Sequence, residues 1–209
     1  MDKQPIPRWL EWAREIQSLS QTGLAFARTE YEKQRYHRLA EIAAEIVHDH
    51  TNLPVEKLTD NFMIQPGYAT PKIDVRGAVV QDNKILLVKE ISDGRWSMPG
   101  GWADVGDMPS HVAEREVLEE SGFQVRPFKV IGVFDANRSG RPLEFYHAFK
   151  IIFLCELIGG EARPSDETSD VGFFNFNDLP PLSTNRTNER HLQEVRLHLA
   201  DPSRDVSFD

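Results

Sequence analysis

The spacing of apolar residues changes once along the chain, from a helical period to a strand period. Between Pro7 and about Thr51 apolar side chains recur every three or four positions, which is typical of amphipathic helices. Two stripes, split near Gly23, consist of Trp9, Trp12, Ala13, Ile16 and Leu19, and of Tyr36, Leu39, Ala43, Ile46 and Val47. Because two helices alone bury too little apolar surface, we expect them to pack on the rest of the chain or on a second subunit.

The segment after these stripes has neither period. Four residues that interrupt helices and strands punctuate it, namely Pro54, Pro66, Gly67 and Pro71. We therefore predict an N-terminal helical domain with its connector at residues 1–66 and a second domain at residues 67–209.

The second part of the chain predicts strands interrupted by one helix and closed by another. The runs IDVRGAVV and KILLVKEI flank the polar QDNK and predict a hairpin. Further strands are expected in QVRPFKVIGVFDAN, EFYHAFKIIFLCELIGG and VGFFNF, and a closing helix in NERHLQEVRLHLA. This order favours an α/β (α+β) fold in which a mixed sheet carries a helix on either face.

Composition and charge disfavour several classes of function. The chain has 24 Lys and Arg against 33 Asp and Glu, a net charge of −9, which disfavours binding to a nucleic-acid backbone. No apolar run approaches the ~18 residues of a membrane span, and the N-terminus lacks an apolar signal core, so we expect a cytoplasmic protein. The single Cys155 lies in the apolar run FKIIFLCEL and is expected to be a buried, inert thiol rather than a catalytic one.

The stretch GGWADVGDMPSHVAEREVLEESGF, residues 100–123, concentrates the charged residues. It predicts a helix from about Ser110 to Ser121, with Pro109 in its first turn and Gly122 at its end. Val117 and Leu118 are expected to point toward a core.

On that helix Glu116, Glu119 and Glu120 project within roughly 100° of one another. Clustered carboxylates repel unless a cation lies between them. The arrangement suits a divalent cation with oxygen ligands, Mg²⁺ by default or Mn²⁺, and the alternative is a solvated acidic helix face. Arg115 is four residues before Glu119 and is expected to orient it through an ion pair.

The stretch resembles the signature of the Nudix hydrolases. That signature reads Gly, five residues, Glu, seven residues, and then Arg-Glu-aliphatic-any-Glu-Glu-any-Gly-aliphatic. The matching positions are Gly101, Asp107, Arg115, Glu116, Val117, Glu119, Glu120, Gly122 and Phe123. Asp107 departs from the pattern because it stands where the family has Glu, and we do not count it as a metal ligand.

The resemblance implies a Nudix-type α/β/α sandwich and roles for several residues. Glu116 and Glu120 would be the principal metal ligands and Glu119 a further one, with a carbonyl of Gly100 or Gly101 assisting. Arg115 would hold the glutamates in place.

The helical start, YATPKIDVRGAV and PGGWADVG together resemble the Nudix group with an N-terminal helical domain, whose members hydrolyse ADP-ribose or CDP-choline. This resemblance implies a homodimer formed through the N-terminal helices. Some ADP-ribose enzymes carry a proline about fifteen residues after the signature. Here Arg138 lies near that place, as a candidate substrate contact, and Pro142 follows later, which weakens the case for ADP-ribose.

The expected reaction is hydrolysis of the pyrophosphate bond of a nucleoside diphosphate derivative, giving a nucleoside monophosphate and a phosphorylated sugar or alcohol. The general base is Glu116 or the loop residue Glu167. Arg76 is either a phosphate contact or a plain surface residue, and Trp102 either stacks on a base or packs beneath its loop. Rival classes are a catalytically silent Nudix-like nucleotide sensor, which the intact REVLEE disfavours, and an RNA-processing hydrolase, which the charge disfavours.

Overall fold

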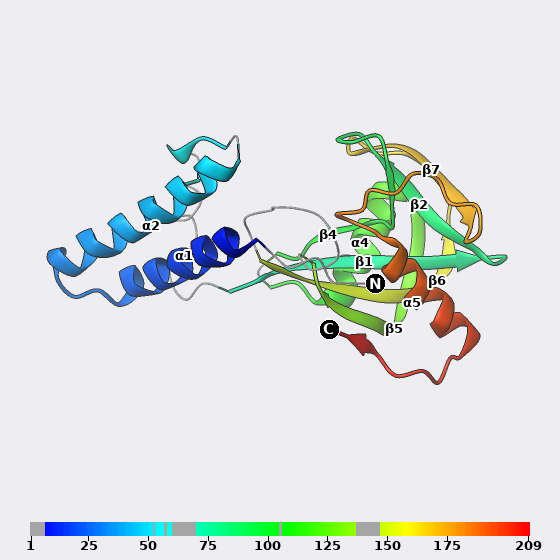
Figure 1. Ribbon diagram of the computed structural model, residues 1–209. Helices are drawn as coiled ribbons and strands as arrows, with labels where there is room; N and C mark the ends of the chain where they lie inside the picture. The colour runs from blue at the N-terminus through cyan, green and yellow to red at the C-terminus, as the bar shows by residue number, and fades with distance from the viewer. Residues whose placement is uncertain (1–6, 52, 57, 60–69, 105, 137–146) are drawn as a thin grey trace. The chain divides into compact units, whose positions relative to one another are not determined.

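The computed structural model describes residues 7–51, 53–56, 58–59, 70–104, 106–136 and 147–209. The chain divides into two compact units, of which the first ends its main segment at Pro71 and the second begins at Lys72. Helices precede a mixed sheet, so the predicted fold class is confirmed (Figure 1). The boundary predicted at residues 66 and 67 lies outside the described residues and stays a prediction.

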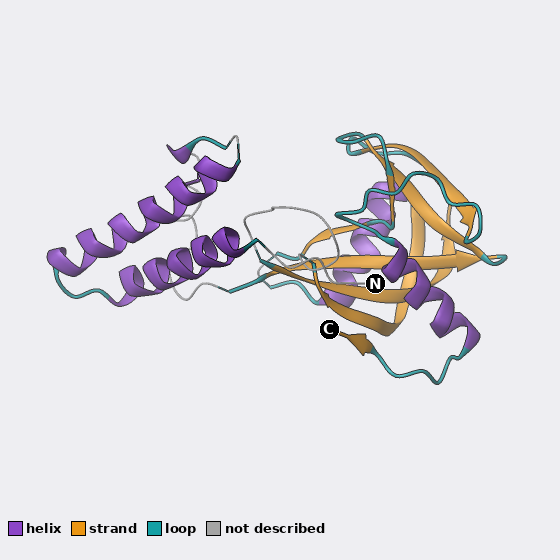
Figure 2. Ribbon diagram, in the orientation of Figure 1, coloured by secondary structure: helices purple, strands orange, loops and turns teal. Residues whose placement is uncertain are grey.

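The first unit is a pair of helices, α1 (Arg8–Phe26) and α2 (Glu30–His50), that run side by side (Figure 2). Thr29 and Glu32 form a capping box, which satisfies free N–H groups at the start of α2. Alanines and larger aliphatic residues of both helices, joined by one residue from the segment after α2, form the core of this unit. The core consists of Leu10, Ala13, Ala40, Ala43, Ala44, Val47 and Leu58.

The two predicted helices are confirmed, but the split predicted near Gly23 comes later, because α1 continues through this residue to Phe26. A Cβ atom at Gly23 would lie 2.2 Å from the ring of Tyr36 on α2. Gly23 therefore provides room for an aromatic ring between two closely packed helices, and the chain reverses after it, at residues 27–29.

The second unit contains the strands β1 (Lys72–Gln81), β2 (Lys84–Glu90), β3 (Trp96–Ser97), β4 (Gly100–Trp102), β5 (Phe123–Asp135), β6 (Ala148–Gly160), β7 (Thr168–Asn175) and β8 (Ser207–Phe208). Their order is β3-β2-β1-β6-β5-β8, with β4 paired to β1 and β7 to β2. The pairs β1–β6 and β5–β8 are parallel and the other pairs antiparallel, so the sheet is mixed. β8 was not predicted.

The hairpin of β1 and β2 is confirmed. Asp82 and Asn83 both have positive φ angles, 50° and 59°, which suits a two-residue turn that follows the twist of the strands. Both residue types tolerate this left-handed conformation better than most.

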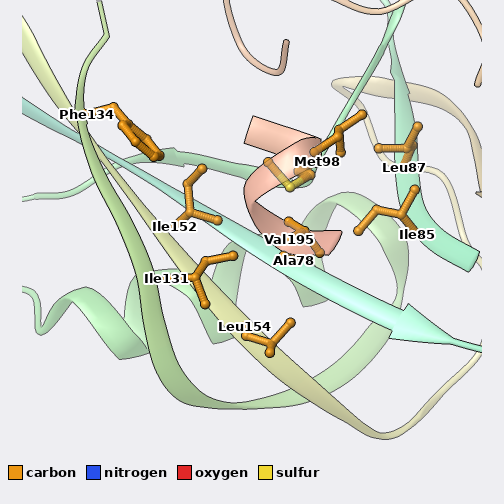
Figure 3. Packing of buried hydrophobic residues seen from close by; sticks show 10 residues of the cluster. Ala78, Ile85, Leu87, Met98, Ile131, Phe134, Ile152, Leu154 and Val195 are labelled. Carbon is orange, nitrogen blue, oxygen red and sulfur yellow. The ribbon is translucent and has the colours of Figure 1, made fainter. Parts of the chain in front are cut away.

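Two helices, α4 (Pro109–Ser121) and α5 (Glu189–Ala200), cover opposite faces of the sheet (Figure 1). Successive residues of β1 divide between them, because Ala78 packs in the cluster with α5 and Val79 in the cluster with α4. Figure 3 shows the cluster beside α5, in which Val195 faces side chains from several strands. No helix in the described part is long and apolar enough to cross a membrane.

Candidate active site

The predicted acidic helix is α4, and its bounds follow from its end residues. Pro109 occupies the first turn, where its missing N–H costs no hydrogen bond, and Gly122 adopts the left-handed conformation with φ 78°. Val112, Ala113 and Val117 are almost fully buried and fix the helix on the sheet. Leu118 is 39% exposed, so the prediction that it points to a core is wrong.

Glu120 lies at the junction of α4 and the sheet and is only 6% exposed. Its Oε2 accepts a 2.9 Å hydrogen bond from the backbone N–H of Gly100. Burial raises the pKa of Glu120 to about 7, although the Arg76 charge and the Gly100 N–H act in the opposite direction. A carboxylate in this setting gains from a nearby cation, because the cation offsets the cost of its charged form.

Glu116 lies one turn before Glu120, and its side chain is 13% exposed. Burial raises its pKa, while Arg115 lowers it and Glu119 raises it further. A Cβ atom at Gly101 would lie 2.9 Å from Oε2 of Glu116. Gly101, whose strand β4 pairs with β1, therefore leaves space for the carboxylate.

The backbone at Gly100 needs glycine for a different reason. Its φ angle is 148°, and a Cβ atom there would lie 2.0 Å from the carbonyl oxygen of Val75. The two glycines thus allow β4 to approach β1 closely and to present backbone groups beside the glutamates.

Arg115 binds three carboxylates at the outer side of α4. Its guanidinium lies 2.8 Å from Glu116, 3.3 Å from Asp107 and 3.6 Å from Glu119, so the predicted pair with Glu119 is confirmed. Glu119 is itself 60% exposed. Asp107 also accepts a 3.1 Å hydrogen bond from the backbone N–H of Asp104, and the shorter acid therefore has a structural use as a partner of Arg115.

The structure brings the loop acid Glu167 to the same helix. The neighbouring Thr168 is buried and donates a 2.7 Å hydrogen bond to the backbone carbonyl of Glu120. The Glu167 side chain is exposed, and its charge contributes to the raised pKa of Glu116. Glu167 therefore lies near the glutamates of α4.

Arg76 lies inside the protein and not on a free surface. It is 6% exposed, and its Nε donates to Asp74 at 2.9 Å while its Nη1 donates to the carbonyl of Met98 at 3.2 Å. Asp74 also pairs with Lys150, which is fully buried. The sequence analysis did not predict this network. Two signals could have indicated it: Asp74 and Arg76, two residues apart, share one face of a strand, and Lys150 interrupts an apolar run.

The remaining predicted residues differ in their exposure to solvent. Trp102 is 47% exposed, so its side chain is not buried beneath its loop and is open to contact. Arg138 and Pro142 lie outside the described residues. Cys155 is buried and free, and burial raises its pKa to about 12, as expected for an inert thiol.

The carboxylates of the site do not complete the coordination shell of a divalent cation by themselves, so other ligands such as water or substrate phosphate would have to supply the rest. Within the ranges described above, no three His, Cys, Asp or Glu side chains are placed to hold a metal together. The charge of Glu116 helps to raise the pKa of Glu120, and Glu120 has no ion-pair partner among the described residues. Two carboxylates fit Mg²⁺, because this ion commonly binds one or two carboxylates and completes its shell with water and substrate phosphate.

Comparison with known proteins agrees with this site. Residues 7–62 match the family described as "UDP-X-like, N-terminal oligomerisation domain", and residues 71–195 match the NUDIX domain. A protein of Bacillus subtilis (strain 168) named "Putative ADP-ribose pyrophosphatase YjhB" is 37% identical over 202 residues, which cover 97% of each chain.

Two solved structures are also similar. An ADP-ribose pyrophosphatase from Streptococcus suis 89-1591 has 37% identity and a TM-score of 0.62, over 67% of this chain and all of that one. A UDP-X diphosphatase has 28% identity and a TM-score of 0.63, over 97% of this chain and 98% of that one. With its NUDIX match over most of the second unit and a full-length relative at this identity, the chain is a Nudix hydrolase.

Proposed function

We propose that this Nudix hydrolase cleaves the pyrophosphate bond of a nucleoside diphosphate linked to a sugar or another alcohol. One observation carries the proposal: Glu116 and Glu120, two largely buried carboxylates, lie beside the paired glycines of β4 without an ion pair on Glu120. Such a pair is costly in a protein that binds no cation.

In the proposed site Glu116 and Glu120 hold Mg²⁺ or Mn²⁺, with Glu119 as a further ligand and a carbonyl of Gly100 or Gly101 assisting. A bound divalent ion would neutralise phosphate charge and lower the pKa of an attacking water. The Gly100 N–H orients Glu120, and Arg115 orients Glu116. Glu167 or Glu116 takes the proton of the water, and attack on phosphorus releases a nucleoside monophosphate.

Two nucleotide classes are favoured by different observations. ADP-ribose is supported by the names of the full-length Bacillus relative and of the Streptococcus structure. A uridine diphosphate derivative is supported by the likeness of both units to a UDP-X diphosphatase. Trp102, a nearly half-exposed residue, is the proposed base contact in either case. Arg76 is buried and bound to Asp74, so of the two predicted arginines Arg138 is the one that stays a candidate substrate contact.

The deciding experiment offers the purified full chain ADP-ribose, UDP-glucose, CDP-choline, NADH and NAD-capped RNA, each with Mg²⁺ or Mn²⁺. Products are resolved by chromatography. ADP-ribose should give AMP and ribose 5-phosphate, and UDP-glucose should give UMP and glucose 1-phosphate. Release of inorganic phosphate from an intact substrate would contradict the chemistry. Tight nucleotide binding with no turnover would favour the sensor, and preferential cleavage of RNA would favour the RNA-processing hydrolase.

We also propose that the first unit forms a homodimer. Three exposed apolar side chains of α1, Trp12, Leu19 and Phe26, follow one another at intervals of seven and so lie on one side of the helix, 50%, 61% and 73% exposed. An apolar row of this kind is typical of a surface that contacts another protein. The match of this unit to an oligomerisation domain supports a second copy as the partner.

A further inference from the structure

Three carboxylates are buried on the strand side of the proposed metal site, and they differ in their partners. Asp74, Glu90 and Glu120 are each 5–6% exposed. Asp74 and Glu90 have ion pairs, and Glu90 is paired with Arg186 at 3.2 Å. For Glu120, no Lys, Arg or His nitrogen of the described residues lies within 4.0 Å. The carboxylate that the proposed cation needs is thus the one left unpaired.

Arg76 lies close to Glu120 but does not bind it. Arg76 is the register partner of Gly100 across β1 and β4, and the Gly100 N–H donates to Glu120. The guanidinium is directed instead to Asp74 and to the Met98 carbonyl. Asp74 and Arg76 are two residues apart on β1 and therefore share a face of the sheet.

Both oxygens of Asp74 are occupied. Its Oδ1 accepts from Arg76, and its Oδ2 lies 2.8 Å from Nζ of Lys150. Lys150 also donates to the backbone carbonyls of Asn185 and Arg186. The Asp74 carboxylate is therefore held from both sides, so that its first oxygen stays directed at Arg76.

We propose that Asp74 is a positioning residue that holds Arg76 away from Glu120 and thereby keeps Glu120 available to the metal cation. The proposal rests on the proposed function of Glu120 as a metal ligand. A buried guanidinium without its carboxylate pairs with another anion, since leaving it unpaired is strongly unfavourable. An Arg76–Glu120 pair would occupy the carboxylate oxygens that a cation needs.

The test measures Mn²⁺ binding to the full chain by electron paramagnetic resonance, without nucleotide. Asp74→Asn is made in the wild-type chain and in an Arg76→Gln background. We expect Asp74→Asn to weaken Mn²⁺ binding roughly tenfold when Arg76 is present, because a charge-assisted hydrogen bond then competes with the ion. In the Arg76→Gln background the same change should weaken binding less than about twofold.

A merely structural role of Asp74 predicts equal weakening in both backgrounds, and this result would overturn the inference, as would unchanged binding in the wild-type background. If Asp74→Asn does not fold, the charge-balanced pair Asp74→Asn with Lys150→Met replaces it, and the same dependence on Arg76 is required. Absence of Mn²⁺ binding to the unaltered chain would instead overturn the proposed metal site itself.

Discussion

At the scale of single residues, Glu120 concentrates the chemistry of the site. Substitution by Gln keeps its shape and its bond from Gly100 but removes the charge that attracts a cation. We expect Glu120→Gln to lower kcat/KM by about 10²-fold or more while the protein stays folded. Activity with ADP-ribose and far-ultraviolet circular dichroism measure the two properties.

The matched control is Glu114→Gln, the same change on the same helix at a position that the signature leaves unspecified, which should keep near-normal activity. Glu119→Gln should have an intermediate effect, because this side chain is largely exposed. Full activity of Glu120→Gln without excess metal would remove Glu120 from the ligand set.

The raised pKa of Glu120 predicts a pH dependence of the metal-free protein. Because its folded pKa, about 7, lies above the ordinary value of 4.5, its contribution to stability is complete below pH 4.5 and is lost as pH rises through 7. The loss amounts to about 3 kcal/mol at most, at roughly 1.36 kcal/mol for each pKa unit. Denaturant unfolding in chelator at pH 5 and pH 8 should show a steeper decline for the wild type than for Glu120→Gln. Parallel declines would show that Glu120 titrates normally.

At the scale of elements, the contact of β4 with α4 makes a separate prediction. Gly101→Ala places a methyl group 2.9 Å from the Glu116 carboxylate, at a backbone conformation open to any residue. We expect Mn²⁺ affinity to fall several-fold while the melting temperature changes little, because only the tip of a partly exposed side chain must move. Gly159→Ala is the control, since its methyl would meet only a flexible glutamine tip at 3.3 Å. Equal Mn²⁺ affinities of the two variants would contradict the steric role of Gly101.

The elements also show what could be predicted from sequence. The bounds of α4 were predictable because Pro109 and Gly122 act locally, and the β1–β2 hairpin was predictable from its polar turn. Gly23 suggested a break between the helices, but the position needs glycine because the ring of Tyr36 on the other helix packs against it. The two-residue strand β8 carries too little pattern to detect.

The same distinction explains the candidate site. Spacing along one helix placed Glu116, Glu120 and Arg115 together, as the structure confirms for the ion pairs of Arg115. The contact between Asp74 and Lys150 depends on the parallel pairing of β1 with β6, which no local pattern records. The buried ion pair of Lys150 was not predicted, because the apolar neighbours of this residue indicate only an ordinary core strand.

At the scale of the whole molecule, the apolar row on α1 predicts assembly. Light scattering of the full chain should give roughly twice the 23.9 kDa chain mass. Trp12→Glu with Leu19→Glu should give the single-chain mass, because charges in an apolar interface are costly to bury. Ile158→Glu, at a 60% exposed position of β6, is the control and should leave the mass unchanged. A monodisperse wild-type monomer would show that the row has no partner copy.

The pairing of β1 with β6 has a consequence for how the protein folds during its synthesis. The α1–α2 contacts are local, whereas β1 finds its parallel partner only when residues from Ala148 onward have been synthesised. Local contacts form early and distant ones late, so the helix pair should fold while the ribosome is still extending the chain. Nascent chains arrested before Ala148 should therefore hold a helix pair that resists protease once it associates with a second copy, and a digestible remainder. Two neighbouring ribosomes on one message would then carry helix pairs ready to associate before either sheet exists.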